Sequence, residues 1–216
     1  MKIVSTGAAL GADIWDVRLD ALDDKTFQDI YQAWLEHNGV LRFPCQNLDD
    51  DKFLDFARRF GDLDMAPINA NGGNWKPEYP ELAVISNVVQ DGKPIGSLGS
   101  YESKWHTDMS YNELPPKASI LYAIELPLEG GNTGFASTAA AYDALSDDMK
   151  ERIAELTCKH DSSHNSVGQV RKGFQEVYED REDIPGAVHP LVAEHPETGR
   201  PVSYTHLRAH ETTVYL

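Results

Sequence analysis

The chain contains 216 residues, and its 19 Lys and Arg against 35 Asp and Glu give a formal net charge of −16. This length fits one domain with a substantial core, and 41% hydrophobic with 25% charged residues is typical of a soluble globular protein. The acidic balance argues against nucleic acid or an anionic membrane as the main partner, because both would repel the surface.

The cysteines and the N-terminal sequence bear on cellular location. Cys45 and Cys158 form no CxxC pair and are too few for a disulfide framework, so we expect two reduced thiols. Residues 1–14 contain no apolar run long enough for a signal peptide or a membrane span. The sequence therefore predicts a cytoplasmic protein, and it leaves open whether the chain forms a homo-oligomer.

An amphipathic helix is expected near the N-terminus. Asp23 and Asp24 are candidate caps, and apolar residues then recur at helical spacing over 27–35. Gly39 is placed to end this helix, and the residues Val-Leu-Arg-Phe-Pro at 40–44 predict a short buried strand.

Two further helices follow the same logic. Residues 47–61 place their aromatic side chains on one helical face, and Gly61 is placed to end the helix. A third helix is expected from Ser146, which is a good N-cap, through Leu156.

Strand-like runs occupy much of the remaining chain. Turns that carry glycine or proline separate them, and the runs lie at residues 82–89, 119–127, 132–137 and 187–195. Helices in front followed mostly by strands indicate an α+β protein with a sheet sandwich or barrel as its core. Residues 66–80 are loop-like, and the long loop-like stretch 161–186 is typical of a lid or binding loop.

One short motif suggests metal chemistry. His106 and Asp108 are separated by a single residue in the stretch Trp-His-Thr-Asp at 105–108. A mononuclear Fe(II) oxygenase uses two imidazoles and one carboxylate on one face of the ion, which leaves the other face open. A His and an Asp at positions i and i+2 of a strand end or tight turn can both reach one ion. By itself this pair is a weak signal, because polar loops produce such pairs freely.

The neighbourhood of the pair strengthens the signal. Residues 105–145 resemble the core of the taurine dioxygenase (TauD/TfdA) family of Fe(II)- and 2-oxoglutarate-dependent dioxygenases. The shared motifs are W-H-x-D, a P-P pair, G-G-x-T-x-F-x-S and A-Y-x-A-L, found here at 105–108, 115–116, 130–137 and 141–145. Further segments that resemble the family occur in family order at 56–63, 85–96 and 184–201.

The resemblance implies a fold, a chemistry and three site residues. It implies a double-stranded β-helix, or jelly roll, in which His106 and Asp108 are the first two iron ligands. Thr133 would donate its hydroxyl to a carboxylate of 2-oxoglutarate, and Trp105 would shield the metal or, as we expect, pack in the core. The implied reaction uses Fe(II), O2 and 2-oxoglutarate, releases succinate and CO2, and hydroxylates a small organic substrate.

The family pattern breaks near the C-terminus. The second iron-ligand His and the Arg that pairs with 2-oxoglutarate would fall beyond Leu216, so we expect this chain to lack both. His195 lies in a segment that resembles a surface turn, and His189 matches a position that is not a ligand. Resemblance stops in the stretch that holds His206 and His210, so we predict a dioxygenase domain at 1–202, truncated, with a foreign tail at 203–216. Such a chain is expected to leave sheet edges and apolar faces open.

The substrate and the function class keep alternatives. Taurine itself is doubtful as the substrate, because Ala66 and Asn69 stand near positions where the taurine branch has a His and a Tyr. An anionic substrate could meet one of four cations, although we expect each of them to be solvated surface charge: Lys76, Lys104, Arg171 and Lys172. The alternative to an enzyme is a non-catalytic jelly-roll protein that binds a ligand. A cupin-like metalloenzyme would need a further cluster of histidines, which the sequence does not show.

Overall fold

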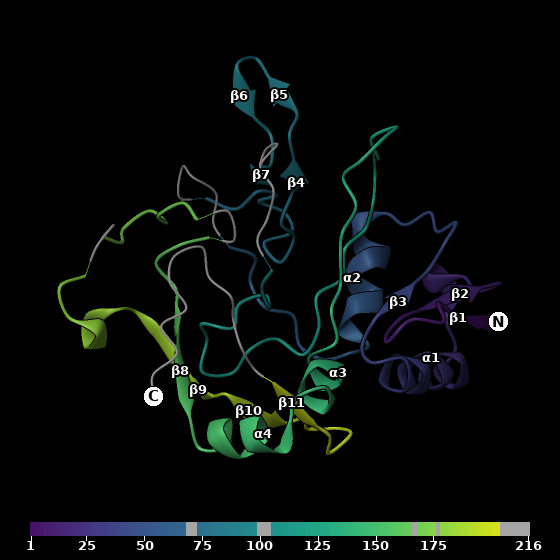
Figure 1. The fold of residues 1–216 in the computed structure, drawn as a ribbon. Helices are drawn as coiled ribbons and strands as arrows, with labels where there is room; N and C mark the ends of the chain where they lie inside the picture. Colours follow the sequence, from purple (N-terminus) through teal and green to yellow (C-terminus); the bar gives the residue numbers. More distant parts are fainter. Residues whose placement is uncertain (68–72, 99–104, 166–167, 176–177, 204–216) are drawn as a thin grey trace. The chain divides into compact units, whose positions relative to one another are not determined.

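The computed structural model describes residues 1–216 except 68–72, 99–104, 166–167, 176–177 and 204–216 (Figure 1). The chain divides into two compact units. The first unit contains Met1–Gly61, Ile120–Leu156 and the described part of Leu191–Tyr204. The second unit contains the described parts of Asp62–Ser119 and Thr157–Pro190. No helix within these described ranges is long and apolar enough to cross a bilayer.

The first unit begins with a small mixed sheet of order β1-β2-β3. Strands β1 (Lys2–Ser5) and β2 (Ala12–Trp15) are antiparallel, and β3 (Leu41–Arg42) runs parallel to β2. The short strand expected at 40–44 is therefore present, but it is half-buried at Leu41 and exposed at Arg42. It is less buried than expected because β3 is an edge strand, and Arg42 instead reaches sideways to the Asp13 carboxylate at 2.6 Å.

The first expected helix is confirmed as α1 (Asp24–Glu36). Asp23 is its N-cap, and the carboxylate accepts a hydrogen bond from the Thr26 backbone N–H at 2.6 Å. The helix ends where Asn38 and Gly39 adopt positive φ angles of 55° and 83°. The Gly39 N–H then bonds the Trp34 carbonyl at 2.8 Å, which satisfies an orphan carbonyl of the last turn.

The core of the first unit joins α1 to the second helix. A short 3-10 turn (Leu19–Ala21) precedes α1, and α2 spans Asp50–Arg58 with Asp49 as its N-cap. Leu19, Ile30 and Phe56 form the buried cluster, with half-buried apolar side chains around it. The periodicity of both helices therefore placed the correct faces toward the core.

The rest of the first unit is a pair of short helices beside a hairpin. Helices α3 (Thr138–Asp143) and α4 (Asp147–Ile153) carry N-caps from Ser137 and Ser146, so the third expected helix is confirmed, although it ends three residues early. Strands β10 (Val192–Glu194) and β11 (Pro201–Ser203) are antiparallel. The Ser203 hydroxyl donates to the Thr138 carbonyl at 3.1 Å, which fastens β11 to α3.

The second unit contains three two-stranded ladders. Strands β4 (Ile85–Ser86) and β7 (Ser97–Leu98) are parallel, and β5 (Val89–Gln90) pairs with β6 (Lys93–Pro94). Strands β8 (Thr157–Asp161) and β9 (Gly186–Pro190) form an antiparallel ladder of five residue pairs, and a 3-10 turn (Arg181–Asp183) precedes β9. The run expected at 187–195 is thus confirmed as β9 and β10, whereas the run at 82–89 forms only β4 and the start of β5.

Two expected strands are not formed. Residues 119–137 are all described, and none of them belongs to a strand. A strand exists only where a second backbone completes its ladder, and no neighbouring strand does so here. Three of the apolar side chains that suggested the strand at 119–127 are instead exposed by 68% to 87%, at Leu121, Ile124 and Leu126. The sequence pattern was therefore correct about apolar content and wrong about local pairing.

Candidate metal centre

A turn in the second unit brings His106 and Asp108 together. Met109 has a positive φ of 48°, and its carbonyl accepts the Asn112 N–H at 3.0 Å, so the chain reverses directly after Asp108. His106 Nε2 lies 3.1 Å from Asp108 Oδ1. The two side chains of the H-x-D motif therefore converge on one point.

The spacing of these two atoms fits joint ligation of one ion. Two ligands held at right angles, each about 2.1 Å from a metal, are about 3 Å apart, which agrees with the 3.1 Å between Nε2 and Oδ1. The side chains of His106 and Asp108 are 29% and 54% exposed, so small molecules can reach them. Within the described ranges, no group of three or more His, Cys, Asp or Glu side chains is arranged to hold a metal.

Ser119 fixes the second oxygen of the carboxylate. Its hydroxyl donates to Asp108 Oδ2 at 2.7 Å, which leaves Oδ1 directed at His106. The hydrogen bond from His106, and after it the one from Ser119, lower the pKa of Asp108 below its ordinary value, although burial opposes them. Asp108 is thereby kept in the ionised form that a metal ligand requires. No local pattern in the sequence pointed to Ser119, because it lies eleven positions after Asp108.

His189 supports the turn from the β8–β9 ladder. Its Nε2 lies 2.9 Å from the Ser110 carbonyl and 3.0 Å from the Asn112 carbonyl. Two carbonyl acceptors require a proton on Nε2, so this nitrogen donates to the turn. The ring of His160 packs edge-on against that of His189 at 5.0 Å. His189 thus contacts the backbone that follows the H-x-D motif, which agrees with its interpretation as a residue that is not a ligand.

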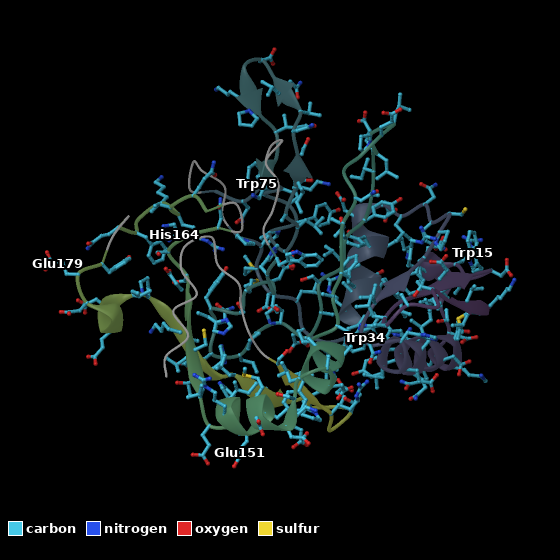
Figure 2. All side chains as sticks on the ribbon, viewed as in Figure 1. Trp15, Trp34, Trp75, Glu151, His164 and Glu179 are labelled. Atoms are coloured by element: carbon cyan, nitrogen blue, oxygen red, sulfur yellow. The ribbon has the colours of Figure 1, made fainter. Side chains whose placement is uncertain are left out.

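Arg171 contacts the same turn from the stretch 161–186. Its Nη1 donates to the Tyr111 hydroxyl at 2.7 Å, and its guanidinium carbon lies 4.5 Å from the Tyr111 ring centroid. Its Nε donates to the carbonyl of His164, which Figure 2 labels, at 3.1 Å. The Arg171 N–H also bonds the Ser163 carbonyl at 2.7 Å. This part of the expected lid or binding loop is therefore folded against Tyr111.

The other predicted site residues include Thr133 and Trp105. Thr133 belongs to the first unit, where it is exposed in a stretch without regular structure, so its contact with 2-oxoglutarate stays a prediction. Trp105 is 58% exposed, so the expectation that it packs in the core is wrong. It lies in an irregular stretch, and its indole is left largely open to solvent. Asn69, Lys104, His206 and His210 lie outside the described residues.

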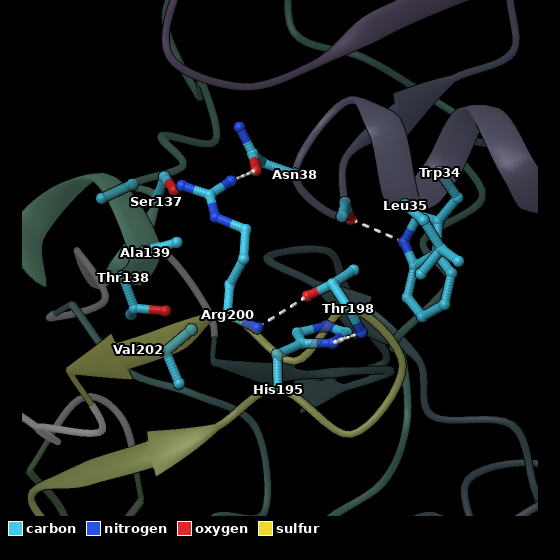
Figure 3. A pocket seen from close by; sticks show the side chains of 12 residues that line it. Trp34, Leu35, Asn38, Ser137, Thr138, Ala139, His195, Thr198, Arg200 and Val202 are labelled. Atoms are coloured by element: carbon cyan, nitrogen blue, oxygen red, sulfur yellow. Dashed lines mark hydrogen bonds between the residues drawn. The ribbon is translucent and has the colours of Figure 1, made fainter. Parts of the chain in front are cut away.

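His195 has a structural role in the first unit. Its Nδ1 accepts hydrogen bonds from the backbone N–H groups of Glu197 and Thr198, both at 3.3 Å, within the β10–β11 connection. It lines a pocket of about 130 Å³ together with Arg200, which Figure 3 shows. Arg200 bonds Asn38 Oδ1 at 2.8 Å and the Asp143 carboxylate at 2.9 Å, so it ties the hairpin to the ends of α1 and α3. These contacts agree with the interpretation of His195 as a turn residue.

Comparison with known proteins identifies the class of this site. A sequence model of the family described as "Taurine catabolism dioxygenase TauD, TfdA family" matches residues 3–215. The chain is 36% identical over 213 residues to the (S)-phenoxypropionate/alpha-ketoglutarate-dioxygenase of Sphingobium herbicidovorans. The aligned region covers 92% of this chain and 68% of that protein. The matched family range includes residues 203–215, for which a foreign origin was predicted. That prediction is not tested, because residues 204–216 are not described.

Two crystal structures share the fold. The structure of AAD-2 in complex with Mn(II) and N-oxalylglycine has 24% identity and a TM-score of 0.66, over 95% of this chain and 69% of that one. A putative alpha-ketoglutarate-dependent taurine dioxygenase from Burkholderia xenovorans has 26% identity and a TM-score of 0.68, over 94% and 62%. The chain belongs to the TauD/TfdA family of 2-oxoglutarate-dependent non-haem iron dioxygenases, whose members use Fe(II), 2-oxoglutarate and O2.

Proposed function

We propose that this chain carries part of the active site of a dioxygenase that hydroxylates a small organic anion and converts 2-oxoglutarate to succinate and CO2. In this proposal His106 and Asp108 are two of the iron ligands, and Thr133 contacts 2-oxoglutarate. The observation that carries the proposal is the 3.1 Å approach of Nε2 to Oδ1, with Ser119 holding the other carboxylate oxygen. An anionic substrate is supported by the relative that acts on phenoxypropionate, which is a carboxylate.

The protein side chains prepare the ligands. When bound, Fe(II) with 2-oxoglutarate and O2 supplies the oxidising chemistry that hydroxylates a C–H bond. To act as a ligand, His106 must carry its proton on Nδ1, so that Nε2, which otherwise donates to Asp108 Oδ1, offers a lone pair to the ion. Asp108 would offer Oδ1 as a carboxylate. Ser119 prevents rotation of the carboxylate, and His189 and Arg171 hold the backbone and the Tyr111 ring that follow it. The residues thus fix the positions of both donor atoms before a metal binds.

The fold that accompanies this function is proposed to be a double-stranded β-helix. The similarity to the two dioxygenase crystal structures supports it, because both TM-scores exceed 0.6. Residues 119–127 and 132–137 would contribute strands to that fold, which explains their apolar composition although they form no ladder here. The proposal predicts that partner strands cover Leu121 and Ile124.

The ligand set of the chain is proposed to be incomplete. We infer that the third iron ligand and the arginine for 2-oxoglutarate are not supplied by this chain. This inference is supported by the described residues, among which no third His, Cys, Asp or Glu joins the pair. The alternative is a non-catalytic protein of this fold that binds a ligand. A two-ligand site leaves most coordination positions to water, so we expect weak iron binding and little turnover.

Anaerobic metal titration tests the metal pair. Mn(II) binding followed by electron paramagnetic resonance should be lost in His106→Ala and retained in His195→Ala, which removes a histidine from a turn in the first unit. Equal binding by both variants would rule out His106 as a ligand. Succinate release is measured in parallel from 2-oxoglutarate with Fe(II). Rapid succinate release by the wild-type chain would show that a third ligand is present and would exclude the non-catalytic alternative.

A further inference from the structure

Arg171 differs from the other cations that were candidates for binding an anionic substrate. Lys76 lies over the Tyr79 ring at 5.8 Å, and Lys172 is exposed. Lys104 is outside the described residues. Arg171 is half-buried, and it contacts Tyr111, three residues after Asp108. It is therefore the described candidate that contacts the turn directly after the His106–Asp108 pair.

The guanidinium of Arg171 is held in place by neutral groups. Its Nε and Nη1 donate to the His164 carbonyl and the Tyr111 hydroxyl, and the Tyr111 ring supports its face. Arg42 and Arg200, by contrast, each contact an Asp carboxylate. Among the described residues Arg171 forms no ion pair, and no hydrogen-bond acceptor is recorded for its Nη2.

A cation arranged in this way is suited to receive an anion. A guanidinium offers its N–H groups in a planar fork that matches the oxygens of a carboxylate or sulfonate. Because Tyr111 and His164 already fix the orientation of Arg171, little side-chain freedom remains to be lost on binding. In a chain with a net charge of −16, a half-buried cation that pairs with no carboxylate of the described residues also provides the local attraction that an anionic ligand needs.

The position of Arg171 suits a substrate that reaches the metal pair. Three residues of extended chain span at most about 11 Å, so the Tyr111 and Asp108 Cα atoms cannot be farther apart. This backbone limit and the contact between Arg171 and Tyr111 attach Arg171 to the segment that carries Asp108.

We propose that Arg171, oriented by Tyr111, binds the anionic group of the substrate, an organic oxyanion such as a carboxylate or a sulfonate. This inference rests on the proposed function, because it places the anion relative to the same His106–Asp108 pair. The competing role for Arg171 is that of a brace, which would stabilise the turn without contacting a ligand. The two roles differ in one respect: only a binding role distinguishes a charged ligand from a neutral ligand of the same shape.

Calorimetric titration of the 216-residue chain separates these roles. The probes are (S)-2-phenoxypropionate, its uncharged primary amide and propane-1-sulfonate, each titrated with and without Mn(II). Arg171→Gln should weaken binding of the preferred anion about tenfold or more, because a hydrogen-bonded charge contact is lost, while the affinity for the amide stays unchanged. Arg171→Lys should recover part of the loss. Lys172→Gln is the matched control, since it removes the same charge from the neighbouring exposed residue, and it should have little effect.

Several results would overturn the proposal. If Arg171→Gln weakens binding of the anion and of the amide equally and also lowers the melting temperature, Arg171 has only a structural role in the turn. Equal weakening by Lys172→Gln would assign a general electrostatic field, and a wild-type chain that binds neither anion at millimolar concentration would exclude the site. If Arg171→Gln fails to fold, Tyr111→Phe tests the same point, because it removes the hydroxyl that orients Nη1 and should weaken only the anion.

The Mn(II) titration distinguishes failure of this inference from failure of the proposed function. If Mn(II) binding depends on His106 but anion binding is unchanged in Arg171→Gln, only the anion site is refuted. Anion binding that depends on Arg171, in a chain that does not bind Mn(II), would refute only the metal pair.

Discussion

Ser119→Ala is the most informative single change at the candidate metal centre. It removes one hydroxyl and the 2.7 Å hydrogen bond to Asp108 Oδ2, while the His106–Asp108 contact keeps both its partners. The carboxylate can then rotate and present either oxygen to His106 or to a metal. We expect the variant to fold normally, because Ser119 is exposed and no other side-chain hydrogen bond is recorded for it.

The size of the effect follows from the type of contact and its exposure. Loss of a partner that orients a metal ligand lowers metal affinity about 10- to 100-fold. Since the Asp108 side chain is 54% exposed, solvent screens the contact, and we expect the lower end of that range, about tenfold. Ser119→Thr keeps a hydroxyl and should retain most of the affinity.

The pH dependence of the same variant has a definite sign. The folded-state pKa of Asp108 lies below its ordinary value, with His106 as the main cause and Ser119 the next hydrogen bond. The resulting stabilisation is present above the unfolded-state pKa and is lost as the pH falls through the folded-state pKa. Without Ser119 the pKa of Asp108 rises toward its ordinary value. Mn(II) affinity should therefore begin to fall at a higher pH in Ser119→Ala than in the wild type.

Anaerobic Mn(II) titration across pH, paired with thermal unfolding, checks this reasoning. Ser146→Ala serves as the control, because it removes the N-cap of α4 and should lower stability without changing metal affinity. Unchanged metal affinity in Ser119→Ala at every pH would show that the hydroxyl does not orient Asp108. A loss of metal affinity that follows the decrease in melting temperature in both variants would show a general effect of stability instead.

Two further predictions concern the scaffold. Gly186→Ala should destabilise the β8–β9 ladder by about 2–4 kcal/mol. The reason is that a Cβ at this position, where φ is 126°, would lie 1.9 Å from the His160 carbonyl oxygen. Thermal unfolding measures the loss of stability, and an unchanged melting temperature would contradict the close approach. Replacing Ile124 and Leu126 by Ser should reduce the self-association measured by light scattering without lowering the melting temperature. The reason is that these two side chains are 87% and 74% exposed. A large drop in melting temperature would show that they are packed in the folded protein.

Local chemistry in the sequence was enough to predict α1, α2 and α4, but not α3. Asp23 and Ser146 have side chains that can accept a backbone N–H, and apolar residues at helical spacing follow each of them, so the start of each helix was predictable. The end of α1 at Gly39 was predictable for the same reason, since glycine accepts the positive φ observed there. The H-x-D pair also belongs to this group, because two residues in one turn cannot be far apart.

Tertiary structure alone decided the pairing of strands and the surroundings of the candidate site. The apolar pattern at 119–127 specified extended, water-avoiding chain, but a strand also needs a second backbone, and the pattern says nothing about where that backbone comes from. Ser119, His189 and Arg171 lie 11 to 81 residues from Asp108 or the turn that follows it in sequence, and no local periodicity records their contacts. The sequence by itself determined which side chains are candidate metal ligands. The folded chain determined which other side chains hold those candidates in position, because such contacts depend on long-range proximity and not on neighbouring residues.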